Sequence, residues 1–457
     1  TAWSKTGSGK LIIAGDASAA KGTASISNGY LQVNGELGGN VNLASGTAAI
    51  GGAGTIDGNV SVGSGTLYGQ GGQTLTIGGD LTLASNSTTS VQWGSATKTP
   101  AFQVNGNLTL AGTLNITDAG GFGPGVYRLA NYNGLLTDNG LQFGTVPGGD
   151  QAKDRMSIQT SYDNQVNVVN TYGAVVKFWD GGYTQDDLDN NKITGGSGVW
   201  KADNQNWTDD QARVLAAFDQ GEFAVFGGEK GNVTVDDSAG QINAAGMQFA
   251  TDGYVLNGGS VNLSSTTGVP IIRVGDGTAD GAKMTATIGS TLTGSQGLNK
   301  TDSGTLILTG QNAYTGGTTV SDGTLQLGDG TTSGSIKGDV TVVRDANGEG
   351  TLAFNQAAGS DTAFSGNISG GGQVVQNGAH TLTLSGNNTF SGGTTVNNGT
   401  LKAGSDNAFG TGSLTVGANG NVDFGATNNT VGVLSGTGAI NIGAGTFTVN
   451  EVADSTY

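Results

Sequence analysis

The sequence predicts an all-β fold: a single-stranded, right-handed parallel β-helix (a solenoid) with one irregular insertion that carries a short helix. Two observations predict it. Glycine makes up 86 of the 457 residues, which is about 19% of the chain against a usual ~7%. Short runs in which apolar and polar residues alternate recur from end to end, at intervals of about 20 residues. A turn-rich chain of short strands with this period is typical of stacked parallel coils.

The shortest repeat is a Gly followed by Asn, Asp or Ser and then by two apolar residues that flank a polar one. The Gly-Asn or Gly-Asp pair favours a tight turn, and the alternation after it predicts a strand with one buried face. The first three copies start 19 and 21 residues apart, so each copy is expected to lie one turn further along the solenoid. The copies are residues 39–43, 58–62, 79–83, 106–110, 338–342 and 412–416.

A larger unit also repeats. Residues 305–325 (TLILTGQNAYTGGTTVSDGTL) and 381–401 (TLTLSGNNTFSGGTTVNNGTL) are identical at 13 of 21 positions. A degenerate third copy opens the chain, where WSKTGSG (3–9) parallels LNKTDSG (298–304) and residues 28–32 parallel 322–326. Each unit is expected to form about one turn. The alternation within the two strong units predicts eight buried residues, namely Leu306, Leu308, Val320, Leu325, Leu382, Leu384, Val396 and Leu401.

Composition excludes several classes of protein. Collagen needs Gly at every third residue and abundant Pro, whereas this chain has 4 Pro. Acidic residues outnumber basic ones 35 to 18, and the Lys/Arg clusters that nucleic acid or an anionic membrane would require are not present. No apolar run approaches the ~18–20 residues of a transmembrane helix, and no signal peptide opens the chain. We expect no nucleic-acid partner, and we expect the sequence to be a fragment of a longer protein.

One region interrupts the repeats. We expect a first β-helical stretch over 1–172, an irregular junction or insertion over 173–230, and a second β-helical stretch with the larger repeats over 231–457. Within the insertion, residues 208–218 predict a short helix, because Thr208 can cap its start and Asp209 and Asp210 stand in its first turn.

The insertion also holds the candidate ligand-binding residues. Exposed aromatic side chains beside polar acceptors suit carbohydrate or protein recognition. The alternative is that these aromatics cover the core where the two β-helical stretches meet. Exposure of the tryptophans would favour the first interpretation. The candidate residues are Trp179, Tyr183, Trp200 and Trp207, and the neighbouring acids are Asp186, Asp187 and Asp189.

The sequence offers little support for catalysis or a metal site. The only histidine, His380, lies within a repeat unit whose other copy has Gly304 at that position, so we expect a turn residue and not a triad member. One His and no Cys exclude a His/Cys zinc site. Paired carboxylates could in principle cut polysaccharides, and the acids at 186–189 could bind calcium. The second acidic pair, Asp236 and Asp237, is adjacent on a strand and would face opposite sides. We expect no catalytic residues and no cofactor.

The two strong units resemble the passenger-associated transport repeat of type V (classical monomeric) autotransporters, through the pattern Thr-Leu-x-Leu-Thr/Ser-Gly-x-Asn-x-Tyr/Phe-Thr/Ser-Gly-Gly-Thr-Thr-Val. Residues 106–147 and 178–207 are similar to two further blocks of such passengers. The resemblance implies a signal peptide before this segment and a C-terminal membrane β-barrel after it, and neither is in the sequence. It also implies a location at the bacterial cell surface or outside the cell.

The leading functional interpretation is an adhesin. Each turn would advance ~4.8 Å, so ~20 turns would make a rod on the order of 95 Å long. Its flat polar faces suit many weak contacts with host extracellular-matrix protein, with glycan, or with a second cell. Two alternatives stay open: a polysaccharide-degrading enzyme on the same scaffold, and an inert spacer of a larger passenger.

Overall fold

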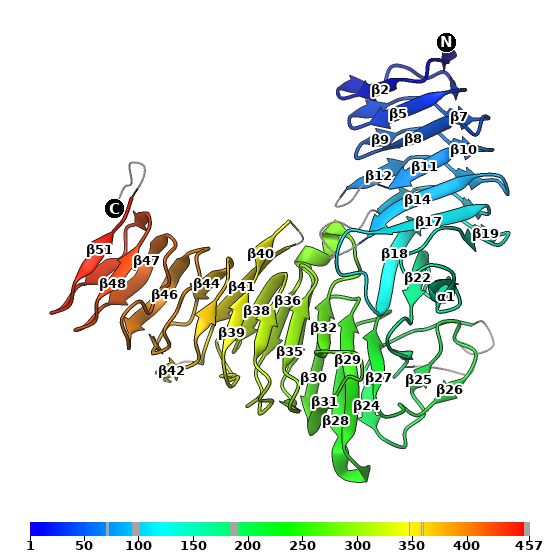
Figure 1. Cartoon of the computed structure of the whole chain (residues 1–457). Coiled ribbons are helices and arrows are strands. Elements are labelled where there is room, and N and C mark those ends of the chain that lie inside the picture. Colours follow the sequence, from blue (N-terminus) through cyan, green and yellow to red (C-terminus); the bar gives the residue numbers. More distant parts are fainter. Residues whose placement is uncertain are drawn as a thin grey trace.

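The structure is a computed structural model, and it describes residues 1–69, 73–93, 101–182, 191–346, 348–357, 359 and 361–451. The predicted fold class is confirmed, because the chain is a parallel β-solenoid of about 20 turns (Figure 1). In the described residues the only α-helix is α1 (Asp150–Lys153), and two 3-10 helices cover Asp237–Ala239 and Ala279–Lys283. We call residues 1–170 the N-terminal arm and residues 176–449 the C-terminal arm.

The N-terminal arm has three faces, each a sheet in which most strands pair in parallel with the strands one turn away. Sheet 1 contains β1 (Trp3–Lys5), β4 (Ala24–Ile26), β7 (Val41–Leu43), β10 (Val60–Val62), β13 (Leu81–Leu83), β16 (Leu108–Leu110) and β19 (Leu136–Asp138). Sheet 2 contains β2 (Lys10–Ile13), β5 (Gly29–Val33), β8 (Ala48–Gly52), β11 (Thr66–Gly69), β14 (Thr88–Trp93), β17 (Thr113–Asp118) and β20 (Gln142–Phe143). Sheet 3 contains β3 (Asp16–Ala17), β6 (Glu36–Leu37), β9 (Thr55–Ile56), β12 (Thr74–Ile77), β15 (Ala101–Val104), β18 (Gly125–Tyr132), β22 (Gln165–Asn170) and β21 (Met156–Gln159), the last two of which are antiparallel.

The four copies of the short sequence repeat in the N-terminal arm form neighbouring strands of sheet 1, as predicted, and the copies at 338–342 and 412–416 lie in the C-terminal arm. In β7, β10 and β13 the two apolar residues are buried and the polar residue between them is exposed, and the three strands lie in register. The residue after each repeat Gly connects neighbouring turns: Asn40 Oδ1 accepts a hydrogen bond from the backbone N–H of Asn59 at 2.8 Å, and Asn59 Oδ1 accepts one from Asp80 at 2.8 Å. This ladder satisfies backbone donors at the corner, where no strand partner is present.

The C-terminal arm is built mainly from two long sheets. Sheet 4 contains β23 (Val176–Trp179), β25 (Trp207–Thr208), β26 (Leu215–Ala216), β27 (Glu222–Phe226), β29 (Ile242–Phe249), β31 (Ser260–Leu263), β32 (Ile271–Val274), β34 (Thr291–Thr293), β35 (Leu298–Thr301), β37 (Thr318–Val320), β39 (Val340–Val342) and β43 (Ile368–Ser369). Sheet 5 contains β24 (Gly198–Lys201), β28 (Asn232–Asp236), β30 (Tyr254–Gly258), β33 (Thr285–Ile288), β36 (Thr305–Leu308), β38 (Gly323–Leu327), β40 (Arg344–Asp345), β41 (Gly348–Phe354), β42 (Thr362–Phe364), β44 (Gln373–Gln376), β45 (Thr381–Leu384), β46 (Thr394–Ala403), β47 (Leu414–Asp423), β49 (Leu434–Gly436) and β50 (Ala439–Asn441). A separate pair is formed by β48 (Asn429–Val431) and β51 (Phe447–Val449).

The two strong repeat units each form a turn with a buried Asn at its corner. All eight apolar residues predicted to be buried are at most 1% exposed. Asn388 is also buried, and its Oδ1 accepts a hydrogen bond from the Ile368 N–H at 2.8 Å while its Nδ2 donates to the Ala408 carbonyl at 2.6 Å. Asn312 stands at the same place in the other unit and accepts from the Leu292 N–H at 2.9 Å. Each Asn therefore ties its own turn to the turns before and after it.

A second buried polar side chain lies near the start of each strong unit. Lys300 is fully buried, and its Nζ donates to the backbone carbonyls of Asp302 at 2.5 Å and Asp322 at 2.9 Å. Gln376 stands at the equivalent position of the other unit, and its amide donates to the Gly378 carbonyl at 2.8 Å. Both side chains satisfy carbonyl groups that the strands leave inside the turn.

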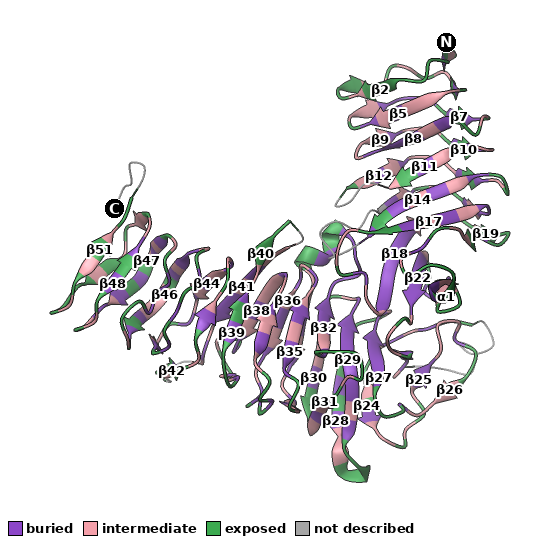
Figure 2. Cartoon of the chain, in the orientation of Figure 1, coloured by how far each residue is buried: buried purple, intermediate pink, exposed green. Residues whose placement is uncertain are grey.

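The solenoid is bent and not one straight rod. The two arms meet at an elbow, where cyan changes to green in Figure 1. Parallel stacking stops there because β22 pairs antiparallel with β18 and β21 pairs antiparallel with β22. An antiparallel hairpin closes the stack of the N-terminal arm, and the C-terminal arm starts in a new direction. Each arm has one main apolar core (Figure 2), and a smaller third cluster joins buried residues of both arms at the elbow.

The position expected for the short helix is wrong, because residues 208–218 form no helix. Instead β25 pairs antiparallel with β26. Asp209 Oδ1 accepts hydrogen bonds from the backbone N–H groups of Gln211 at 3.1 Å and Arg213 at 3.0 Å, and Ala212 has a left-handed φ of +53°. The segment has good helix formers, but β25 also pairs with β23. Such tertiary pairing overrides a weak local propensity.

Candidate functional site

The three tryptophans of the predicted ligand site lie in one buried aromatic cluster at the start of the C-terminal arm. Trp179, Trp200 and Trp207 are each 0% exposed. The ring centroids of Trp179 and Trp207 are 5.2 Å apart, and those of Trp200 and Trp207 are 5.0 Å apart. Phe218 and Phe226 complete the cluster, with centroids 4.7 Å and 5.5 Å from that of Trp207.

This aromatic cluster covers the end of the C-terminal core. The β25–β26 hairpin extends sheet 4 beyond β23, and the rings pack beneath it. A solenoid needs such a cap, because an open last turn exposes both its core and its strand edge. A ligand-contacting role for Trp200 and Trp207 would require these side chains to be exposed, and both are buried. Tyr183, the fourth candidate, lies outside the described residues.

The candidate acidic residues divide into two groups. Those of the insertion lie outside the described residues; they are Asp186, Asp187 and Asp189. The second group holds local backbone: Asp236 accepts a hydrogen bond from the Ser238 N–H at 3.0 Å, and Asp237 accepts from the N–H and the hydroxyl of Ser260 at 2.8 and 2.6 Å. Within the described ranges, no three His, Cys, Asp or Glu side chains gather as a metal-ligand set would.

A different polar site lies at the elbow, where β18 of the N-terminal arm meets β29 and β32 of the C-terminal arm. The side chain of Gln248 pairs with β18 as a neighbouring strand would: its Oε1 accepts from the Val126 N–H at 2.7 Å, and its Nε2 donates to the Val126 carbonyl at 3.0 Å. Gly125 makes this approach possible, because a Cβ there would lie 2.5 Å from Gln248 Oε1 and 2.7 Å from Arg273 Nη1.

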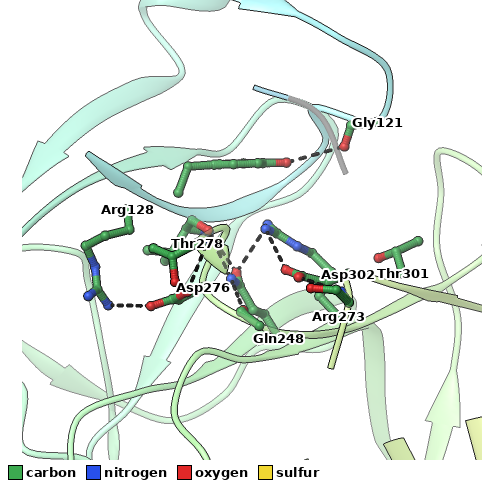
Figure 3. Close-up of polar contacts among 12 residues, drawn as sticks. Gly121, Arg128, Gln248, Arg273, Asp276, Thr278, Thr301 and Asp302 are labelled. Atoms are coloured by element: carbon green, nitrogen blue, oxygen red, sulfur yellow. Dashed lines mark hydrogen bonds and ion pairs between the residues drawn. The ribbon is translucent and has the colours of Figure 1, made fainter. Parts of the chain in front are cut away.

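Two buried ion pairs surround this contact (Figure 3). Arg128, on β18, places Nη2 3.3 Å from Asp276 Oδ2 across the elbow, and its Nε donates to Asn167 Oδ1 at 2.7 Å. Arg273, on β32, places Nη2 3.4 Å from Asp302 Oδ2. Both arginines are thus paired and hydrogen-bonded, as buried charges must be. The elbow is held by directional contacts as well as by apolar packing.

A cavity of about 260 Å³ lies beside these ion pairs, between the loop before β18 and the C-terminal arm. Tyr127 forms one wall, with the Arg273 guanidinium 4.4 Å from its ring centroid. Asp302 forms another, and burial raises its pKa to about 6, against the lowering effect of the Arg273 and Lys300 charges. The cavity can hold a small polar molecule, but Arg273 and Asp302 already neutralise each other. Their arrangement supports the elbow and provides no nucleophile–base pair.

The sequence analysis did not single out these elbow residues, although a signal for them exists. Arg128 and Arg273 each stand inside an apolar strand run, VYRLA and IIRV. A charged residue in such a run is expected to be buried with a partner. The apolar pattern around Arg128 does not show which residue pairs with it, because Asp276 lies 148 residues further along the chain.

Comparison with known proteins identifies the family of the larger sequence repeat. The family model of the passenger-associated transport repeat matches residues 4–33, 298–327 and 374–403. These ranges contain all three units seen in the sequence, including the degenerate copy at the start. A parallel β-solenoid that carries these repeats is an autotransporter passenger domain, and this chain belongs to that class. It is therefore a cell-surface or extracellular protein.

One curated relative extends the comparison. The chain is 40% identical over 420 residues to the adhesin BmaC autotransporter of Brucella suis biovar 1 (strain 1330). The aligned region covers 84% of this chain and 12% of the relative, so the chain spans about an eighth of that protein's length. No solved structure matches the chain. In the described residues, no helix has the length and apolar character needed to cross a bilayer.

Proposed function

We propose that this chain is an adhesive segment of a bacterial surface adhesin, which binds host matrix protein, a glycan or a neighbouring cell. The observation that carries the proposal is the 40% identity to an autotransporter adhesin along 84% of the chain. The word adhesin belongs to the name of the relative. That this chain is also adhesive is our proposal.

The surface of the solenoid supports an adhesive role. Parallel stacking repeats outward side chains at about 4.8 Å, and many of them are hydroxyl or amide groups that bond to each other between turns. Thr415 Oγ1 and Ser435 Oγ are 3.0 Å apart, and Asn397 Nδ2 donates to Asn377 Oδ1 at 2.8 Å. Such long polar faces favour many weak contacts in parallel, which give high avidity without a deep pocket.

The test compares beads coated with the folded chain against beads coated with the heat-unfolded chain. We expect the folded chain to bind host cells or extracellular matrix, or to clump the beads. Clumping without host material would identify self-association as the adhesive mode. If folded and unfolded chains retain equal numbers of cells and no beads clump, the proposal is wrong and the chain is a spacer. Shortening of added polysaccharides by the soluble chain would instead indicate the enzyme alternative.

A further inference from the structure

A long, shallow groove lies on the outer surface of sheet 2 in the N-terminal arm. Its volume is about 830 Å³, and its lining includes residues of β5, β8, β11, β14 and β17, which stack along the upper arm in Figure 1. Five neighbouring strands span about 19 Å. The groove is long enough for an extended chain molecule, and it is far from the elbow ion pairs and the aromatic cluster in sequence.

Two tyrosine rings line the part of this groove between β5 and β11. Tyr30 is on β5 and Tyr68 is on β11, and their ring centroids are 5.8 Å apart with an interplanar angle of 84°. The strand between them, β8, supplies Ala49 opposite Tyr30 and Gly51 opposite Tyr68. A Cβ on Gly51 would lie 2.7 Å from the Tyr30 hydroxyl and 3.1 Å from Tyr68 Cβ. The small residues of β8 therefore give the rings the space that they occupy.

The tyrosines depart from the pattern of this face. In the same two ladders, most of the other outward residues are small or polar, namely Gln32, Thr66, Thr88, Ser90, Thr113 and Asn115. Ile12 on β2 is an exception, since it is apolar and 51% exposed. Tyr68 is 41% exposed, and the Lys10 ammonium lies 5.3 Å from the Tyr30 ring centroid. Outward rings add little to the core of the solenoid, and clustered exposed apolar surface marks an interaction site more often than chance.

The chemistry of the lining selects among ligands. None of the 11 lining residues has an ionised side chain, although the chain has a net charge of −17. Apart from the tyrosines, the polar groups are hydroxyls and one amide, from Ser8, Thr47, Ser90, Gln92 and Thr117. A sugar ring has one apolar C–H face, which suits a tyrosine ring, and a rim of hydroxyls, which suits these side chains. An anionic polymer would meet a strongly acidic protein, in which the Lys10 ammonium beside the Tyr30 ring is a cation at the edge of the lining.

We propose that the Tyr30–Tyr68 groove binds a neutral linear glycan, whose sugar rings pack on the two tyrosines and whose hydroxyls bond to the side chains along β14 and β17. The proposal rests on the adhesive function above and names the ligand class of one adhesive surface. Several sugar units lie along the groove at once, but the groove is shallow and its lining has no charged side chain, so the affinity of one chain for one glycan is modest. Many copies at a cell surface provide the avidity.

The experiment is a calorimetric titration of the full chain with neutral hexasaccharides of β-1,4-linked N-acetylglucosamine, xylose and mannose. A hyaluronan hexasaccharide serves as the acidic probe and gelatin as the protein probe. We expect at least one neutral hexasaccharide to bind, and Tyr68→Ala to raise its Kd about tenfold, a loss of the size expected for one ring–ligand contact. The matched control is Tyr172→Ala, which removes a tyrosine that is 55% exposed outside the groove and is expected to leave the Kd unchanged.

Thermal melting confirms that each variant is folded. If Tyr30→Ala melts early, Tyr30→Leu retains apolar bulk without the aromatic ring and is expected to weaken binding as well. The proposal is overturned if no neutral hexasaccharide binds, if Tyr68→Ala binds as tightly as Tyr172→Ala, or if only hyaluronan or gelatin binding depends on Tyr68. If beads coated with Tyr68→Ala adhere fully, the Tyr30–Tyr68 groove is not the adhesive surface, and the adhesin proposal is unaffected.

Discussion

Arg128 and Asp276 form a buried ion pair across the elbow, with Nη2 3.3 Å from Oδ2, although 148 residues separate them in the chain. The side chains are 8% and 6% exposed. Burial lowers the pKa of Arg128, and the Asp276 carboxylate acts against that effect. The Asp276 carboxylate therefore offsets part of the cost of burying the Arg128 charge, and it can do so only while the two arms stay in contact.

Asp276→Ala is expected to loosen the elbow. It leaves the Arg128 charge buried without its partner, which costs about 3–5 kcal/mol of stability. Small-angle scattering should show a wider distribution of shapes, and chemical denaturation should show the loss of stability. The control is Lys283→Ala, which breaks the exposed pair with Asp280 and should change neither measurement. Unchanged scattering and stability in Asp276→Ala would show that the elbow does not depend on the Arg128–Asp276 pair.

The aromatic cluster gives a second prediction. Trp200→Ala removes a fully buried ring and should lower the free energy of unfolding of the C-terminal arm by about 3–5 kcal/mol. Val199→Ala is the matched control, because Val199 is the preceding residue on β24 and is 38% exposed, so the free energy of unfolding should change little. If Trp200→Ala retained its stability and lost adhesion, Trp200 would be a ligand contact and not part of the core.

The buried Asn of the transport repeat gives a third prediction. Asn388→Ala leaves the Ile368 N–H and the Ala408 carbonyl without their side-chain partner, and such unpaired buried groups cost about 1–3 kcal/mol each. Asn387→Ala, one residue earlier and exposed, is the control. Hydrogen exchange should rise in the turns next to residue 388 and stay unchanged in the N-terminal arm, because a solenoid turn contacts only its neighbours. Equal exchange in the two variants would contradict a bridging role for Asn388.

The stacked turns could be predicted from sequence because their contacts are periodic. Alternation in 39–43 and its copies, and in 305–325 and 381–401, predicts which side chains face the core. Local propensity predicts a helix over 208–218, but the pairing of β25 with β23 is a tertiary contact that local propensity does not include.

The elbow and the groove could not be predicted in the same way. Arg128 and Asp276 share no period, and the bend depends on where parallel stacking stops. Tyr30 and Tyr68 are two turns apart, but turn lengths in the N-terminal arm vary, so only the observed register shows that Ala49 and Gly51 lie between them. Burial of Trp179, Trp200 and Trp207 likewise depends on which strand covers them, which composition does not specify.

Lys300 gives the last prediction, which concerns pH. Burial lowers its pKa to about 8 from the ordinary 10.5, against the raising effect of the Asp302 and Asp322 charges. Below pH 8 the folded and unfolded chains are both protonated at this residue. Between pH 8 and about 10.5 the folded chain has released the proton and the unfolded chain still binds it, so the free energy of unfolding rises with pH.

The rise can reach about 3 kcal/mol across that interval, since each unit of pKa shift corresponds to about 1.4 kcal/mol. Lys300→Gln tests it, because Gln376 shows that an amide fits the equivalent position of the neighbouring repeat. Denaturation of both proteins from pH 7 to 10 should show the stability of the natural chain, relative to the variant, increasing steadily above pH 8. Lys402 is exposed, and Lys402→Gln is the control: its stability relative to the natural chain should not change in this way with pH. Tyrosine ionisation affects all three proteins equally, so it drops out of these comparisons. A difference between Lys300→Gln and the natural chain that stays constant across this range would mean that Lys300 remains protonated in the fold, held by the carbonyls of Asp302 and Asp322.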